Sequence, residues 1–167
     1  MKKLASRTVQ TPLVAEFTFN WNDWVVDSAD GAKKTLGSTV ALSADPAEAG
    51  LTGPVANTIV FDCIPLPPGA VLCGGELIVE TPYAGSTAAT ILLGIAGATS
   101  GILGSTSLMA AASTRTALLL TTALQSNAGG ANVRATIAYT VANATAGKAR
   151  VRIMYTVDNR QSEVQIS

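Results

Sequence analysis

The 167-residue sequence contains no histidine and only two cysteines, and charged and aromatic side chains make up only 13% and 5% of it. Without histidine, the chain lacks the commonest general base and the commonest metal ligand. Two thiols, those of Cys63 and Cys73, are too few for a four-thiolate zinc site within one chain. These absences argue against most catalytic and metal-binding classes. We therefore expect a protein that is not an enzyme and that needs no cofactor.

Long apolar runs are missing as well. No charged side chain lies between Thr81 and Thr114, but glycine, serine and threonine interrupt this segment. Its most apolar part, residues 88–98, is too short to span a bilayer. The basic start at residues 1–4 is followed by polar residues instead of the apolar core of a signal peptide. We expect a soluble chain that is made in a reducing cytoplasm.

The net charge is zero, but the two halves of the chain differ in sign. Residues 1–85 carry nine acidic and five basic side chains, whereas residues 86–167 carry two acidic and six basic ones. A neutral chain with oppositely charged halves can associate with copies of itself or with a large partner. Nucleic-acid-binding domains usually have a clear basic excess, so we do not expect nucleic acid as a partner.

Length and composition predict one all-β domain. A mass of 17.0 kDa is typical of a single domain. The content of glycine, proline and threonine is too high for a helical bundle, and the 48% of apolar residues is too high for a disordered chain. We expect an extended arm over residues 1–12, peripheral strands and loops over residues 13–56, and the main β-sandwich over residues 57–167.

Alternation of apolar and polar residues locates the strands. The clearest alternation occupies residues 57–64, 70–80, 88–96, 133–141 and 149–157. Shorter strands are predicted at 14–19, 24–26 and 36–42, with a turn at 27–31. Residues 105–125 fit a short helix or a loop, followed by a strand over 116–122. About eight or nine strands separated by turn signals are typical of an antiparallel sandwich or jelly roll, with local up-and-down pairing as the alternative.

Two connections suggest which strands pair. Residues 143–147 have the length of a hairpin loop, which would make the last two strands neighbours. In the sequence, Cys63 and Cys73 each lie five residues from Pro68. A hairpin turn centred there would place the two cysteines opposite each other on the inward face. A disulfide is then geometrically feasible. In a reducing compartment, two buried free thiols are the favoured interpretation.

Two further features resemble catalytic or ligand-binding motifs. Glu76 and Glu80 face the same way on one strand, but about 13 Å of strand separates them, more than the 5–9.5 Å that glycoside hydrolysis requires. We interpret them as solvent-facing. The glycine-rich stretch Gly94–Gly104 follows a strand but lacks the lysine of a phosphate-binding loop. It predicts a mobile surface loop, or one that a partner orders.

A basic row is the remaining candidate. Lys148, Arg150 and Arg152 share one face of the last strand, and Arg134 has matching outward parity on the strand before it. Such rows are often merely solvated. The functional hypothesis is a face that docks an acidic protein surface, with these four residues as the partner-binding set. No aromatic residues interleave the row, which argues against nucleic acid.

Residues 64–81 contain a Pro–Gly turn that leads through paired glycines into an alternating strand. Residues 145–160 contain a second alternating strand, which runs into a short polar tail. Together the two stretches resemble the Pro–Gly turn and the closing strand of the capsid decoration (cement) proteins of tailed bacteriophages. The resemblance covers residues 57–160. The sequence departs from the family pattern at Gly94–Ala96, where an aspartate often follows the glycine.

The resemblance implies a jelly roll that binds the outside of an assembled capsid and bridges neighbouring capsomers. Its partners would be the major capsid protein and further copies of itself, as a homodimer or homotrimer, with no nucleic acid, membrane or small-molecule substrate. It would be made in the host cytoplasm and lie on the virion exterior, with its N-terminal arm laced over the shell. The alternative is a tail-associated or carbohydrate-binding module, for which Trp21, Trp24 and Tyr83 are the candidate aromatic residues.

Overall fold

The computed structural model describes residues 12–29, 31–37, 58–119, 130–140 and 143–157. All regular structure in these ranges is β-strand, and none of it is a helix that could cross a membrane. The strands are β1 (Leu13–Asn20), β2 (Trp24–Val26), β3 (Lys33–Thr35), β4 (Thr58–Ile64), β5 (Ala70–Ala84), β6 (Ala88–Ile95), β7 (Ala98–Ser107), β8 (Thr114–Ala117), β9 (Val133–Thr140) and β10 (Ala146–Val157).

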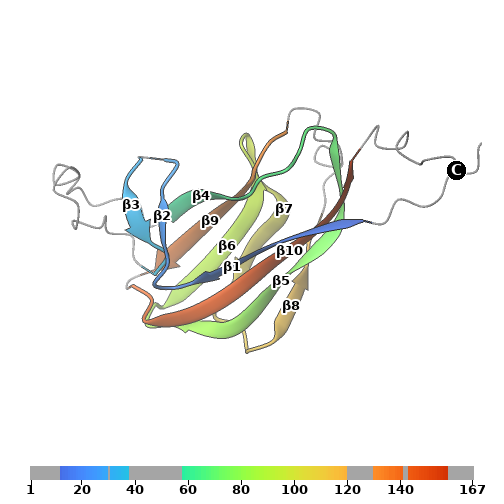
Figure 1. The fold of residues 1–167 in the computed structure, drawn as a ribbon. Helices are drawn as coiled ribbons and strands as arrows, with labels where there is room; N and C mark the ends of the chain where they lie inside the picture. Colours follow the sequence, from blue (N-terminus) through green and yellow to red (C-terminus); the bar gives the residue numbers. More distant parts are fainter. Residues whose placement is uncertain (1–11, 30, 38–57, 120–129, 141–142, 158–167) are drawn as a thin grey trace, which may run out of the picture.

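Two four-stranded antiparallel sheets form a sandwich (Figure 1). Their strand orders are β1–β10–β5–β8 and β4–β9–β6–β7, and the short hairpin β2–β3 lies at one end. From β4 onward the chain changes sheet at every connection except the β6–β7 hairpin. This winding is that of a jelly roll, so the predicted fold class is confirmed and up-and-down pairing is wrong. The expected N-terminal arm lies almost wholly outside the described residues.

The core lies between the two sheets and follows the predicted alternation. Odd-numbered residues of β4 and β9 and alternate residues of β6 and β10 are buried. Branched aliphatic side chains from both sheets belong to one hydrophobic cluster, which includes Ile59, Ile91, Ile137 and Val151. Burying each of these side chains stabilises the fold by about 1.5–3 kcal/mol. The period of two therefore identified the buried faces of these strands.

β5 departs from simple alternation at a β-bulge. Leu72 pairs with Tyr155 and Gly74 with Met154, so Cys73 is an extra residue in the strand. The bulge shifts the inward face from even-numbered to odd-numbered residues. Gly75 makes it possible, because a side chain there would overlap the backbone of Arg152. The predicted inward orientation of Cys73 is therefore wrong.

The two cysteines are not opposite each other. β4 and β5 belong to different sheets, and both thiols are free. Cys63 is buried, with its thiol 3.3 Å from the carbonyl oxygen of Val133, whereas Cys73 is exposed. The preference for free thiols is confirmed, but burial holds for Cys63 alone. Desolvation raises the pKa of the Cys63 thiol to about 12.

The last two strands do not form a hairpin. β9 pairs with β4 and β6, whereas β10 pairs with β1 and β5 in the opposite sheet. The connection through residues 143–145 therefore crosses from one sheet to the other. Arg134 on β9 consequently does not neighbour the basic residues of β10, and the predicted grouping of the four is wrong.

The glycine-rich stretch is ordered as a hairpin. β6 and β7 pair from Ile95 and Ala98 at the turn to Thr90 and Ser107 at the far end. The prediction of a mobile loop over Gly94–Gly104 is wrong, because most of this stretch forms β7. Beyond β7, residues 108–113 form a turn and β8 follows, so the helical alternative is not realised there. Residues 120–125 of that prediction lie outside the described residues.

The N-terminal strands take part in the sandwich. β1 and β2 match the predicted strands, and β1 pairs along its whole length with β10. β1 forms one edge of its sheet, and Phe19 reaches from it into the core. The predicted turn at 27–31 is present, with the carboxylate of Asp27 accepting a hydrogen bond from the backbone of Ala29. The sequence pattern did not predict β3. Of the strand expected at 36–42, residues 36–37 form a turn, and residues 38–42 lie outside the described ranges.

Candidate functional site

The most highly charged described surface is the outer face of the β1–β10–β5–β8 sheet. β10 lies between β1 and β5, and its basic residues have acidic neighbours on both sides. We call this set the charged ladder. It consists of Glu16, Glu76, Glu80, Arg115, Lys148, Arg150 and Arg152.

One end of the ladder is built around Glu80. Lys148 Nζ lies 2.8 Å from Glu80 Oε2, and Arg150 Nε lies 3.3 Å from Glu80 Oε1. Arg150 also reaches towards β1, with Nη1 3.7 Å from Glu16 Oε2. The hydrogen bond from Lys148 holds the pKa of the Glu80 carboxyl below its ordinary value. Glu80 is therefore ionised and paired at neutral pH.

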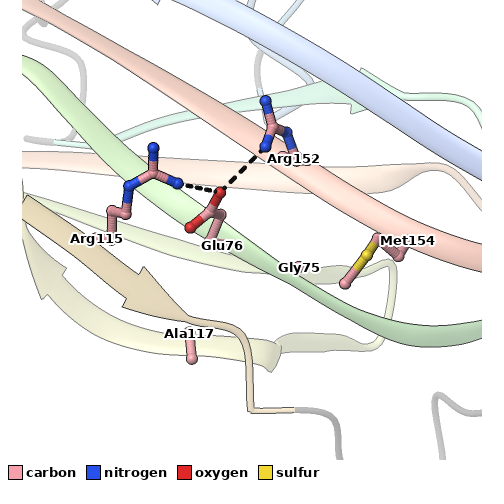
Figure 2. Close-up of a pocket in the computed structure, with 6 residues that line it drawn as sticks. All are labelled: Gly75, Glu76, Arg115, Ala117, Arg152 and Met154. Atoms are coloured by element: carbon pink, nitrogen blue, oxygen red, sulfur yellow. Dashed lines mark hydrogen bonds and ion pairs between the residues drawn. The ribbon is translucent and has the colours of Figure 1, made fainter. Parts of the chain in front are cut away.

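The other end is built around Glu76. Arg115 Nη1 from β8 lies 2.6 Å from Glu76 Oε1, and Arg152 Nη1 from β10 lies 3.4 Å from the same oxygen. Arg152 Nε also contacts Glu16. Figure 2 shows the two guanidinium groups converging on one carboxylate. Glu76 and Glu80 thus face outward, as interpreted from the sequence. Each carboxylate is paired with basic side chains, and the two do not form a carboxylate pair.

The predicted basic row of β10 is paired with carboxylates, so the surface that it forms is of mixed charge. Each of the three basic residues of β10 has a carboxylate partner within the sheet, and the ladder as a whole carries four cations and three anions. Exposed ion pairs contribute only about 0.2–1 kcal/mol each. A partner's charged groups can therefore replace the ion-pair partners within the sheet at a small cost in free energy. The ladder suits recognition of a surface of mixed charge better than capture of a strongly acidic one.

Arg134 belongs to a separate ion pair on the opposite sheet. Its Nε lies 2.8 Å from Asp62 Oδ1, and the side-chain amide of Asn132 donates to Asp62 Oδ2 at 3.2 Å. The hydrogen bond from Arg134 lowers the pKa of the Asp62 carboxyl. Three of the four predicted partner-binding residues are thus brought together, and the fourth lies on another face.

An open hollow adjoins the Glu76 end of the ladder (Figure 2). Gly75 of the β5 bulge lines this hollow, together with Met154, Ala117 and ladder residues. Met154 is exposed, as is Val14, its cross-strand partner on β1. An apolar margin therefore borders the charged ladder. Sequence reasoning missed Glu16, Arg115 and Met154 as members of this surface, because only the register between strands brings them to it.

The three candidate aromatic residues do not form one platform. Tyr83 is buried in the core, whereas Trp21 and Trp24 are 37% and 59% exposed. Lys33 Nζ lies 3.8 Å from the centroid of the Trp24 ring, a cation–π contact. The carbohydrate-binding hypothesis loses Tyr83 but keeps both tryptophans.

Within the described ranges, no group of three or more acidic or cysteine side chains is placed to hold a metal ion. The hollow itself contains one carboxylate held by two guanidinium groups, an arrangement suited to polar recognition.

No protein-family model and no curated protein matches the sequence. Among solved structures, the chain is similar to a chain of the "Cyanophage Pam1 capsid asymmetric unit", with 15% identity and a TM-score of 0.51. The likeness covers 94% of each chain. At this identity it shows a shared fold alone, and it extends over almost the whole length of both chains.

Proposed function

We propose that this chain is a structural virion protein that binds the outer surface of an assembled phage capsid and stabilises it by bridging neighbouring capsomers. The observation that carries the proposal is the likeness, over 94% of both chains, to a chain of a cyanophage capsid asymmetric unit. The two stretches that resemble decoration proteins add support. They cover most of β5 and all of β10, which are hydrogen-bonded neighbours in one sheet.

The charged ladder is the proposed contact with the major capsid protein. Lys148, Arg150 and Arg152 provide donors that can leave their intrasheet partners for carboxylates of the shell. The apolar margin at Met154 and Val14 would add burial beside these polar contacts. The chain would act on the virion exterior after synthesis in the host cytoplasm, as a homodimer or homotrimer.

Binding of the purified chain to undecorated shells tests this assignment. Replacing Arg150 and Arg152 with alanine should weaken binding by about tenfold and flatten its dependence on salt, because rim charges set the electrostatic part of binding. The free energy of unfolding should change little, by about 1 kcal/mol, since both side chains form ion pairs that water still reaches in part. Arg134→Ala is the matched control, because it removes a paired guanidinium from the opposite sheet.

Two outcomes decide the assignment. Loss of binding in the double variant, with normal binding of Arg134→Ala, supports the ladder as the docking face. Unchanged binding of the double variant would place the docking surface elsewhere. Deleting residues 1–12 then tests whether the expected N-terminal arm is that surface.

A second candidate function is carbohydrate binding, favoured by the exposure of Trp21 and Trp24. Sugar rings stack on exposed aromatic faces, so a bound glycan should change tryptophan fluorescence. A glycan-dependent change that Trp24→Ala abolishes would support this alternative. No change across a glycan panel would reject it.

A further inference from the structure

An amine and a carboxyl group are buried together within the β2–β3 hairpin. Asp27 directly follows β2, and Lys34 is the middle residue of β3. The side chains of Lys34 and Asp27 are 0% and 1% exposed, and Lys34 Nζ is hydrogen-bonded to Asp27 Oδ2. Bulk water is therefore excluded from a primary amine that is in direct contact with a carboxyl group.

The two oxygens of the Asp27 carboxylate have different surroundings. Oδ2 is the oxygen in contact with the Lys34 amine. Oδ1 accepts backbone hydrogen bonds from Ala29 at 2.9 Å and from Val60 at 3.2 Å. Two N–H donors on one oxygen stabilise the negative charge that develops there when a nucleophile adds to the adjoining carbon. The carboxyl group thus has an amine at one oxygen and donors for an oxyanion at the other.

Burial also favours the reactive form of the pair. Both charged groups lose their hydration inside the protein, and their mutual attraction offsets this cost only in part. Transfer of one proton from the ammonium to Oδ2 leaves a neutral amine, which is a nucleophile, and a carboxylic acid. Because Cγ is bonded directly to Oδ2, the contact places the amine near the separation of about 3–3.5 Å from which a nucleophile attacks.

We propose that Lys34 and Asp27 condense to an intramolecular isopeptide bond, for which the ion pair is the preceding state. Lys34 Nζ attacks Cγ of the protonated Asp27 side chain, and the tetrahedral intermediate carries its negative charge on Oδ1. A further amine proton moves to the Oδ2 hydroxyl, the Cγ–Oδ2 bond breaks, and Oδ2 leaves as water. The products are one amide and one water molecule. The reaction consumes no oxidant or reductant, so a reducing compartment does not oppose it.

The bond would fasten the end of β2 covalently to the middle of β3. The amide oxygen, formed from Oδ1, keeps its hydrogen bonds from Ala29 and Val60, so the contact with β4 is retained. Two buried charges are replaced by a neutral amide, which removes the cost of their desolvation. The inference goes beyond the proposed function, because it concerns the chain alone and can fail whatever the result of shell binding.

The intact mass of the purified full chain, measured after unfolding so that non-covalent contacts are lost, tests the bond. The wild-type chain should be lighter than the mass calculated from its sequence by about 18 Da, the mass of one water molecule. Lys34→Met keeps an unbranched side chain but has no amine, so it should have its full calculated mass. Lys33→Met is the matched control, because Lys33 lies over the Trp24 ring and should not take part in the bond.

Fragmentation of a tryptic digest locates the bond. Cleavage after Lys34 should be blocked, and one branched peptide should contain both Asp27 and Lys34. The sequence Asp30–Gly31 can also lose water, by cyclisation of the aspartate to a succinimide. That loss would persist in Lys34→Met, so the variant separates the two reactions.

The wild-type measurement needs no variant, so it decides the question even if Lys34→Met does not fold. A lighter fraction that grows with time in the folded chain, but not in a chain kept unfolded in urea, supports the proposal. A wild-type chain that keeps its full calculated mass after prolonged incubation in the folded state would overturn it and leave the pair ionic. A loss of water that Lys34→Met retains would overturn it as well.

Discussion

Tyr83 and Tyr139 lie in the same core with ring centroids 6.4 Å apart, yet only one of their hydroxyl groups is hydrogen-bonded. The Tyr139 hydroxyl donates to the backbone carbonyl of Leu36, which ties the chain after β3 to β9. The buried Tyr83 hydroxyl has no partner in the described part of the chain. Burial raises the pKa of both phenols, so both are neutral donors across the physiological range.

Replacing each tyrosine with phenylalanine should therefore have opposite effects. Tyr83→Phe removes an unsatisfied polar group and should raise the free energy of unfolding by about 1 kcal/mol. Tyr139→Phe leaves the Leu36 carbonyl without its donor and should lower it by about 1 kcal/mol. Urea denaturation measures both. Equal losses in the two variants would contradict the difference in hydrogen bonding.

A buried ion pair lies within the β2–β3 hairpin, and its carboxylate also accepts a hydrogen bond from β4 of the sandwich. Asp27 and Lys34 are both fully buried, and the Asp27 carboxylate also accepts from the backbone of Ala29 and Val60. Asp27→Ala removes a buried charge from these contacts and should cost about 3–5 kcal/mol of stability. Asp62→Ala, which breaks an exposed pair, should cost no more than about 1 kcal/mol. Similar losses in the two would show that the Asp27 pair does not anchor the hairpin.

Gly147 at the start of β10 lies directly against the ring of Tyr83. It has a φ of 145°, and an added side chain would overlap that ring. Gly147→Ala should therefore destabilise the fold by about 1–3 kcal/mol. Gly104→Ala is the control, because a Cβ there meets no atom within 4 Å. A thermal melt in which both variants match the wild type would contradict this packing.

The two thiols should differ in reactivity. Alkylation requires the thiolate and access to the reagent. Cys63 is buried and its pKa is raised to about 12, so it stays protonated at pH 8, whereas Cys73 is exposed. Intact mass after treatment of the native chain with iodoacetamide should show one adduct, removed by Cys73→Ser, and two after unfolding. Modification of Cys63 in the native chain would contradict its burial.

Local alternation predicted the strands and their buried faces where the pleat is regular. Ile59 and Phe61 on β4, and Ala135 and Ile137 on β9, all point inward as expected. This succeeded because the period of two depends only on neighbouring residues. It failed at the β5 bulge, where one extra residue exchanges the two faces of the strand.

Sheet partnership could not be predicted in the same way. The loops after β4 and β9 have lengths that suit hairpins, but both cross between the sheets. A short loop does not specify whether its strands pair or pack face to face. The wrong grouping of Arg134 with Arg150 and Arg152 follows from this, as does the expected contact between Cys63 and Cys73. Only part of the charged ladder could be predicted from the sequence. Glu16 and Arg152 are distant in the chain, and only the pairing of β1 with β10 makes them neighbours.

The number of copies of this chain in purified particles of its source tests the central claim most directly. Quantitative mass spectrometry against the major shell protein would give that number. Decoration of the whole shell predicts a ratio near one, or a simple fraction such as one half or one third. A handful of copies per particle, or none, would contradict a role in bridging capsomers across the shell.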